Sequence, residues 1–343
     1  MGKTAIFSRK ISGGVYAIED QSLSTGDRWF VDSGQTTTGA DAAGYGTSPD
    51  QPFLTLAYAF SGNNPTANNG DIIYVMPGHA ESITAAAGIA QDIEGVTVEG
   101  IGVGADRPEI TFASSDNSAT YTVTAANSVI KNVVGICGDD GLTSAFVVSA
   151  ADCAIDIEWQ DGSSAIEAST VITSTAAANN LDIKLRYIGF TAGNACVSPI
   201  ILTGNDGIRV DIDFYGKAST AVVEFKTTAV IDTNVTGYMY NSGTTDFSKS
   251  VVDTVGGSTW FADFFDGAAG GRASGGSGGA LASDDITLVS SKVDSVGTQV
   301  STVDSEVSVI DTEIGVIASK QDSQVTLQST QYSTLVSKID SNS

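Results

Sequence analysis

The fold of this chain is indicated by residues 29–83, WFVDSGQTTTGADAAGYGTSPDQPFLTLAYAFSGNNPTANNGDIIYVMPGHAESI. A short apolar strand opens it, and a loop rich in Gly, Thr, Asp and Ser follows, which belongs at the surface. Apolar residues then recur at helical spacing over residues 54–61, with Thr55 as a candidate N-cap. A helix this short is not stable alone. We therefore expect it to pack on the buried strand at residues 71–76, which ends at a Pro-Gly turn, and so to cap the first rung of a stacked β structure.

From about residue 71 to residue 255, the sequence shows a weak internal repeat of strand, small turn and strand. Four turn residues mark the repeat at separations of 25, 27 and 26 positions: Asn127, Asp152, Asn179 and Asn205. Asn and Asp suit such corners because they tolerate left-handed backbone angles. Apolar and polar residues alternate within each copy, so the apolar side chains point inward. Each rung alone buries little, and a core forms only when the rungs stack.

This order of parts resembles right-handed parallel β-helix proteins, most closely those among the virion proteins of tailed bacteriophages. The residues that carry the resemblance are Phe30-Val31-Asp32, Gly46-Thr47-Ser48-Pro49, Gln51-Pro52-Phe53, Thr55, Ala59 and Gly70-Asp71-Ile72-Ile73-Tyr74-Val75-Met76-Pro77-Gly78. We therefore expect an all-β fold, a right-handed parallel β-helix with a short N-terminal capping helix, followed by a C-terminal coiled coil. The resemblance implies a structural protein of a phage particle, located in the virion and bound to other virion proteins such as those of the capsid.

Composition shifts divide the chain into four predicted parts. Residues 1–28 form an N-terminal arm, which either anchors the protein on a larger assembly or pairs with the side of the solenoid. Residues 29–265 form the β-helix body, with the N-terminal cap at 54–61 and an aromatic closing cap that begins at Trp260. Residues 266–283 are a Gly/Ser-rich flexible linker, and residues 284–340 are a coiled coil.

The coiled coil is predicted from apolar residues that alternate steps of three and four along the C-terminal segment. These residues are Ile286, Val289, Val293, Val296, Val300, Val303, Val307, Ile310, Ile314 and Ile317. β-Branched residues at the d positions fit poorly in a parallel dimer, so we expect a homotrimer first and a tetramer second. The alternative is a single amphipathic helix folded on its own body.

The frame of the coiled coil is expected to shift after Ile317. A strict heptad would place Gln321, Gln324, Gln328 and Gln331 in the seam, and all four buried amides would need partners. A one-residue shift, called a stutter, locally unwinds the supercoil. It instead brings four large side chains into the seam: Val325, Tyr332, Leu335 and Ile339.

Charge and cysteine content exclude several classes of function. Acidic residues outnumber basic ones by 40 to 16, so nucleic acid is not an expected partner. The longest apolar runs are too short for membrane insertion, and the N-terminal sequence has no apolar secretory core, which indicates synthesis in a host cytoplasm. The three cysteines, Cys137, Cys153 and Cys196, have irregular spacing and are expected to be buried free thiols.

Charged residues of the repeat are predicted to form two outward columns. The alignment places Ile155, Ile157 and Trp159 beside Ile183, Leu185 and Tyr187, and these beside Val210, Ile212 and Phe214. The intervening residues then stack as Asp156, Lys184, Asp211 and as Glu158, Arg186, Asp213, with about 4.8 Å between rungs. Lys131 extends the first column if Ile130 points inward. We interpret this ladder as relief of charge repulsion, not as catalysis.

No catalytic residue, cofactor or metal site is predicted. His79 is the only histidine, so a Ser-His-Asp arrangement would need it, and we expect it at the surface or in the turn. Asp139-Asp140 and Asp161 are acidic loop residues without EF-hand spacing.

Two functional hypotheses remain open. The favoured one is a homotrimeric capsid decoration or fibre protein that also attaches to host-surface glycan. The alternative is a tailspike-like enzyme that cleaves host polysaccharide, which two close, unpaired carboxylates and aromatic platforms would favour. A bacterial adhesin is a third, weaker reading because no export signal is visible.

Overall fold

The computed structural model describes residues 26–61, 64–244, 247–276, 282–283 and 286–341, with the backbone alone for the described residues between 282 and 294. The predicted N-terminal arm, residues 1–28, therefore lies almost entirely outside the described residues. The chain divides into two units, Met1–Asp284 and Asp285–Ser343. Each unit is described by itself below.

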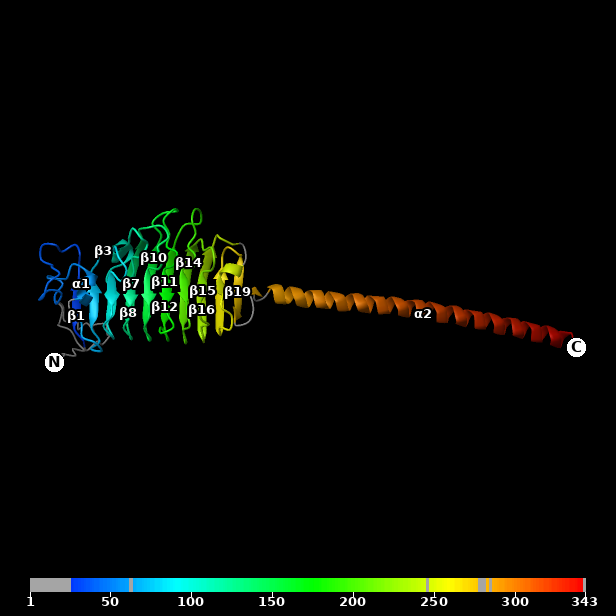
Figure 1. The fold of residues 1–343 in the computed structure, drawn as a ribbon. Coiled ribbons are helices and arrows are strands. Elements are labelled where there is room, and N and C mark those ends of the chain that lie inside the picture. Colours follow the sequence, from blue (N-terminus) through cyan, green and yellow to red (C-terminus); the bar gives the residue numbers. More distant parts are fainter. Residues whose placement is uncertain (1–25, 62–63, 245–246, 277–281, 284–285, 342–343) are drawn as a thin grey trace, which may run out of the picture. The chain divides into compact units, whose positions relative to one another are not determined.

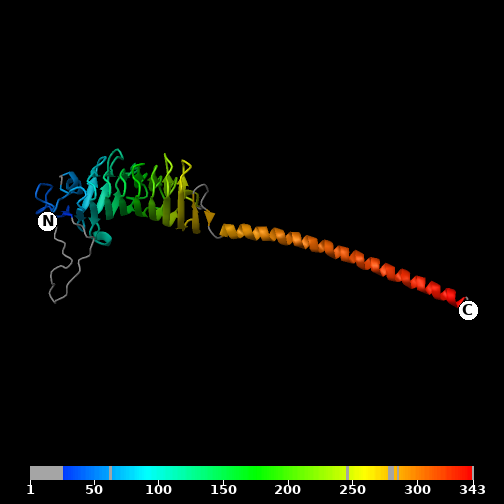
Figure 2. The same ribbon diagram turned by 90° about the horizontal axis from the view of Figure 1, so that it is seen from below.

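The first unit is a parallel β-solenoid of about seven turns over residues 72–266. Most turns contribute one strand to each of two sheets, and the strands stack in sequence order from blue to yellow (Figures 1 and 2). The main strands of the first sheet are β2 (Ile72–Val75), β5 (Thr97–Gly100), β8 (Val129–Cys137), β10 (Ala154–Gln160), β12 (Asp182–Ile188), β14 (Arg209–Gly216), β16 (Thr233–Asn241) and β18 (Trp260–Asp266). The second sheet consists of β4 (Ile89–Gln91), β7 (Tyr121–Val123), β9 (Phe146–Val148), β11 (Ile172–Ser174), β13 (Ile200–Leu202), β15 (Val223–Phe225) and β17 (Val251–Asp253).

The core is built from inward side chains that stack from one rung to the next. In the first sheet, Trp159 of β10 pairs with Tyr187 of β12, and Tyr187 pairs with Phe214 of β14. All three are at most 1% exposed, and the Tyr187 and Phe214 ring centroids lie 4.8 Å apart. The predicted alignment of inward residues is therefore observed. Because side chains alternate across a strand, this register also fixes which residues face outward.

The corners of the rungs form a hydrogen-bonded stack of left-handed residues. Asn127 and Asp152 have φ of 57° and 58°, as predicted. Their N–H groups donate to the Ala151 carbonyl at 3.1 Å and the Asn179 carbonyl at 2.9 Å on the next rung. Further corner residues with positive φ in this part of the chain are Asn68, Gly95, Asn180, Gly207 and Asp232. Each corner turns the chain in a conformation that Gly, Asn and Asp tolerate.

Two of the four predicted turn residues, Asn179 and Asn205, do not have the expected left-handed conformation, although Asn179 does lie in the turn. The left-handed residue of its rung is Asn180, with φ of 53°, and not Asn179. Asn205 is buried, and its amide accepts from the Thr203 N–H at 3.0 Å and donates to the Ala178 carbonyl at 3.1 Å. The reason is that an amide on an inward position can satisfy buried backbone groups, whereas spacing alone does not distinguish this role from a turn.

The N-terminal end is capped as predicted. Strand β1 (Arg28–Val31) pairs in parallel with β2, and helix α1 (Leu56–Ser61) buries Leu56, Ala59 and Phe60. The Thr55 hydroxyl accepts from the Tyr58 N–H at 3.1 Å, which is the geometry of a side-chain N-cap.

An extra loop interrupts the early rungs of the first sheet. The N-terminal half of β8 pairs with β5 and its C-terminal half with β6 (Glu109–Phe112), which also pairs with β3 (Ala80–Ile83). Between β5 and β6 lies the short 3-10 helix η1 (Gly104–Asp106). Asn132 has φ of 57° at the irregularity in β8, and its amide donates to the Gly100 carbonyl at 2.7 Å. This bulge allows one long strand to pair with two shorter ones.

The C-terminal end of the solenoid differs from the prediction. Strand β18 is the last parallel rung, with Trp260 and Phe264 buried but Phe261 and Phe265 about half exposed. Strand β19 (Gly271–Gly276) pairs antiparallel with β18, and β20 (Ala282–Ser283) pairs with β19. The expectation of a flexible linker is therefore wrong for Gly271–Gly276. Small residues on an added strand can pair through the backbone alone, so a Gly-rich composition does not exclude a strand.

The second unit contains one helix, α2 (Ile286–Asp340), of 55 residues. Its apolar residues follow the predicted three-and-four spacing. Of the predicted oligomerisation residues, Ile286, Val289 and Val293 lie in the part of α2 described by its backbone alone.

Candidate functional site

The outward face of the first sheet carries the predicted charged columns. Asp156, Lys184 and Asp211 occupy paired positions on β10, β12 and β14. The Lys184 ammonium lies 3.4 Å from Asp156 Oδ2. No ion pair joins Lys184 to Asp211 among the described residues. Both partners of the Asp156–Lys184 pair are more than half exposed, so the pair contributes at most about 1 kcal/mol.

Lys131 occupies the next position of this first column, because it pairs with Asp156 in the register and Ile130 points inward. Its ammonium does not contact Asp156, however, but lies 3.2 Å from Glu99 Oε2 on β5. The column therefore continues as a second acid–base pair on the preceding rungs.

The second column is organised around Glu158, whose side chain is only 4% exposed although it faces outward. Arg186 lies 3.1 Å from Glu158 Oε2 and 3.7 Å from Asp213 Oδ2, which places it between the two predicted carboxylates. Arg107, from the loop that follows η1, lies 2.9 Å from Glu158 Oε2. The Gln160 amide donates to Glu158 Oε1 at 2.7 Å. Sequence reasoning missed Arg107 because its loop lies outside the repeat.

These contacts decide the protonation of Glu158. Burial raises the pKa of a carboxyl group, but the hydrogen bonds from Gln160 and Arg107 and the charges of Arg107 and Arg186 outweigh that effect. The pKa of Glu158 is therefore held below its usual value. A carboxylate that is ionised and covered by two guanidinium groups is poorly suited to act as a general acid.

Beyond β14 the second outward column becomes aromatic, whereas the first continues with Thr236 and Asp263. The second column continues from Asp213 to Tyr238 of β16 and Phe265 of β18. Next to it, Tyr215 of β14 pairs with Tyr240 of β16. The Tyr238 and Phe265 rings stack with centroids 5.7 Å apart and an angle of 11° between their planes, and Tyr215 and Tyr240 stack at 5.2 Å and 21°. Aromatic residues on a solvent-facing column are a candidate interaction surface.

A second group of carboxyl groups lies in the loops that follow the strands of the first sheet. Glu167 is 4% exposed, and neither of its carboxylate oxygens has a hydrogen-bond partner among the described residues. Burial, together with the negative charges of Asp161 and Asp140, raises the pKa of Glu167 to about 7. The Asn194 side chain and the Lys217 charge offset this only in part. Sequence reasoning singled out Asp140 and Asp161 but not Glu167, because these loops have no shared period.

Asp161 is the second unusual carboxyl group of these loops. It accepts a hydrogen bond from the Tyr187 hydroxyl at 2.6 Å and from the Trp159 indole N–H at 3.2 Å. Burial nevertheless raises the pKa of Asp161 to about 6. No group of three or more His, Cys, Asp or Glu in the described part of the chain has an arrangement suited to a metal ion.

His79 closes the Pro-Gly turn, because its N–H donates to the Met76 carbonyl at 3.1 Å, so the expectation of a turn position is confirmed. The alternative of a surface position is wrong, because His79 is buried, with 1% exposure. Its Nδ1 accepts from the Ser33 N–H at 3.0 Å, and its Nε2 lies 3.2 Å from Glu81 Oε2. The same Glu81 carboxylate accepts from the Leu56 N–H at 2.7 Å at the start of α1. The single histidine therefore ties strand β3 to the N-terminal cap, and this network explains its position without catalysis. The three cysteines are free and buried, as expected.

Helix α2 exposes the predicted seam. From Val296 to Ile317, the a and d side chains are between 52% and 63% exposed. The predicted residues beyond the frame shift, Val325, Tyr332, Leu335 and Ile339, are 57% to 70% exposed.

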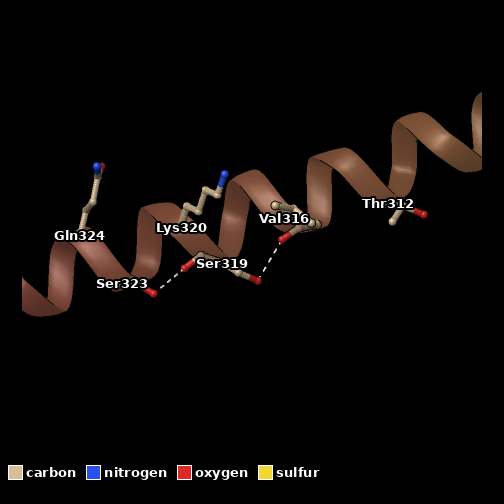
Figure 3. A pocket seen from close by; sticks show the side chains of 7 residues that line it. Thr312, Val316, Ser319, Lys320, Ser323 and Gln324 are labelled. Carbon is tan, nitrogen blue, oxygen red and sulfur yellow. Dashed lines mark hydrogen bonds between the residues drawn. The ribbon is translucent and has the colours of Figure 1, made fainter.

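Many Ser and Thr residues of α2 donate their hydroxyl groups to backbone carbonyls of the preceding turn. Ser319 and Ser323 donate to the carbonyls of Gly315 and Ser319 at 2.9 Å and 2.8 Å, and Figure 3 shows both bonds. The hollow drawn there is lined by residues of this one helix, among them Thr312, Val316 and Lys320. An open hollow on a single helix has no second wall to enclose a ligand.

Comparison with protein-family models, with curated proteins and with solved structures finds no match to this chain. Within the described residues, no helix combines the length and the apolar character needed to cross a membrane.

Proposed function

We propose that this chain is a homotrimeric structural protein of a bacteriophage virion, either a capsid decoration or a fibre protein. In this proposal the body is a right-handed parallel β-helix and α2 is the parallel three-stranded coiled coil. The observation that carries the proposal is the seam of β-branched residues on α2, whose members from Val296 to Ile317 are each more than half exposed.

The composition of α2 supports association. Outside the seam it is rich in Ser and Thr, and these residues and the β-branched seam residues have lower helix propensity than Ala, Leu, Glu or Lys. Burial of an exposed Val or Ile contributes about 1 kcal/mol or more. A 55-residue helix of this composition therefore needs the burial of its seam to be stable in water.

The virion location rests on the resemblance of residues 30–78 to β-helix virion proteins and on the architecture of the body. A stacked solenoid with inward aromatic residues and paired outward charges is a rigid spacer. We propose that it is made in the host cytoplasm, is mounted on other virion proteins such as those of the capsid, and attaches to glycan on the host surface. Imaging of virions with an antibody against α2 tests the location, and virions without the epitope would contradict it.

The mass of the purified chain tests the oligomer. Light scattering at micromolar concentration is expected to give three times 35.0 kDa. Substitution of Val303→Asp together with Ile310→Asp is expected to give a monomer with an intact body, because two charges cannot be buried in the seam. Ser305→Asp, outside the seam, is the matched control and should leave the mass unchanged. A monomer or dimer for the unaltered chain would refute the trimer.

A second candidate is a tailspike-like enzyme that cleaves host polysaccharide. Glu167 favours it, since an unpaired carboxyl group with a pKa of about 7 resembles a general acid. The low exposure of Glu167 opposes it, because a sugar could not reach this carboxyl group without a rearrangement of the surrounding residues. Reproducible glycan cleavage that is lost in Glu167→Gln would establish this candidate. Cleavage lost in Asp156→Asn or Glu158→Gln would instead assign catalysis to the outward columns.

A further inference from the structure

The last three rungs of the first sheet present an exposed aromatic face, defined here as Tyr215, Tyr238, Tyr240, Phe261 and Phe265. Four of these side chains are between 41% and 52% exposed, and Tyr240 is half-buried. They lie on β14, β16 and β18. The positions of β10 and β12 in the same columns carry none of these rings and are Ala154, Glu158, Gln160, Asp182, Arg186 and Ile188. Aromatic residues gathered on a surface in this way are typical of protein interfaces.

The orientation of the rings indicates which partner the aromatic face fits. Tyr238 stacks on Phe265 and Tyr215 stacks on Tyr240 along the direction in which the rungs stack. The ring faces within these two stacks are therefore turned toward the neighbouring rung, and the ring edges are left at the surface. The Tyr238 hydroxyl lies beside Gly267. Packing of a sugar on an aromatic platform needs a free ring face. Ring edges suit the apolar and edge-to-face aromatic contacts between two proteins.

The charges around the aromatic face permit approach of an identical chain. Each chain carries a net charge of −24, so most of its surface repels a copy of itself. Near the aromatic face, however, Asp263 is paired with Arg272, whose Nε lies 2.7 Å from Asp263 Oδ1. Asp213 lies 3.7 Å from Arg186. The carboxylates beside Tyr238 and Phe265 are thus compensated within the chain.

We propose that the aromatic face packs against the solenoid body of a second copy of this chain. The inference rests on the proposed homotrimer, because copies joined through α2 have an effective concentration near the millimolar range. At that concentration a modest contact between bodies becomes populated. The contact extends the assembly from the coiled coil to the closing rungs of the body and excludes water from the aromatic columns.

Thiol reactivity in the full chain tests the contact. Asn234→Cys places a thiol beside Phe261, with which Asn234 pairs, and keeps every aromatic residue. Asp182→Cys is the matched control, since it is exposed in the same outward column two rungs earlier. The native thiols are buried and give little background. Each variant is compared in the otherwise unaltered chain and in the Val303→Asp, Ile310→Asp background with a maleimide reagent.

The expected result is at least a tenfold slower reaction of Cys at position 234 in the trimer than in the monomer background, with less than a twofold change at position 182. Phe265→Ser together with Tyr238→Ser should restore most of the reactivity without changing the mass. A trimer in which position 234 reacts as fast as in the monomer would overturn the contact but keep the proposed function. Protection that requires an added glycan or virion protein would assign the face to that partner instead. A monomeric chain would overturn both proposals.

Discussion

Substitution of Glu167 by Gln is the sharpest test of the unpaired carboxyl group in the loops. Glu167 is buried and has no hydrogen-bond partner for either oxygen among the described residues. Glutamine keeps the shape but removes the negative charge. We therefore expect Glu167→Gln to be more stable than the unaltered chain at pH 8 and to lose most of that advantage at pH 5.

The magnitude follows from the pKa of Glu167, which is raised from 4.5 to about 7. Because the folded-state value is the higher one, the folded state holds the proton more tightly. The stability that this bound proton contributes to the folded state is fully present below pH 4.5 and is lost as the pH rises through 7. At about 1.4 kcal/mol per pKa unit the loss is at most about 3.5 kcal/mol. Screening by solvent near the loop surface reduces it to about 1–2 kcal/mol.

The assay is urea unfolding between pH 5 and pH 8, followed by tryptophan fluorescence at a fixed protein concentration. Trp159 is a suitable reporter because its indole N–H is hydrogen-bonded to Asp161 in the same loops. Asp161 also has a raised pKa, of about 6, so both chains lose stability as the pH rises to about 6. The informative window is therefore pH 6 to 8, where the Glu167→Gln chain should be nearly flat.

The matched control is Glu109→Gln, the same substitution at an exposed position of β6. The free energy of unfolding of Glu109→Gln should equal that of the unaltered chain at every pH. If Glu167→Gln keeps the full loss of stability between pH 6 and 8, Glu167 is not the titrating group. If Glu167→Gln is destabilised equally at all pH values, the carboxylate has a partner that the structure does not reveal. Either result would refute the reasoning.

Three further outcomes are expected. Arg107→Met should lower the free energy of unfolding by about 1–3 kcal/mol, because Arg107 compensates the charge of the buried Glu158. Lys184→Met, at an exposed ion pair, should change the free energy of unfolding by less than about 0.5 kcal/mol, and the midpoints of urea unfolding measure both effects. Val325→Asp should lower the oligomer mass measured by light scattering, whereas Gln324→Asp should leave it unchanged. The reverse pattern would show that the heptad continues without a frame shift. Gly237→Ala should lower the free energy of unfolding by about 2 kcal/mol or more, since Gly237 has φ of 131° and a Cβ there would lie 2.0 Å from the Ile212 carbonyl oxygen. Gly256→Ala, at a position with open space around it, should lower it by only about 1 kcal/mol.

The register of the solenoid could be predicted because two periods coincide in the sequence. Side chains alternate with a period of two within a strand, and each rung repeats after about 25 to 28 residues, as the corners at Asn127, Asp152 and Asn180 show. A shift by one residue would turn Trp159 outward and Glu158 inward, which is strongly unfavourable. The alternation therefore determines the pairing of Asp156 with Lys184 and of Glu158 with Arg186.

The environment of each charged residue could not be predicted in the same way. Glu158 was expected to be exposed, but Arg107 reaches it from a loop inserted between β5 and β6. Glu167 lies in loops whose sequences share no period, so nothing in one sequence relates it to Asp161. The corner at Asn180 was displaced by one residue from the prediction for a similar reason, because turn length varies while strand register does not. Inserted segments determine how deeply a carboxyl group is buried and which charges and hydrogen-bond donors reach it, and together these determine the direction of its pKa shift.

The outward face of the first sheet shows how one strand pattern can serve two purposes. On β10, β12 and β14 its positions carry charges that compensate one another, which lets strands of an acidic chain stack without repulsion. On β16 and β18 the first column carries Thr236 and Asp263, whereas the second carries Tyr238 and Phe265, which leave about half of each side chain in water. Stacking within the chain does not require this exposure, since Thr236 or Asn234 occupies equivalent outward positions. The proposed contact with a second copy of the chain accounts for the change from charged to aromatic residues in the second column.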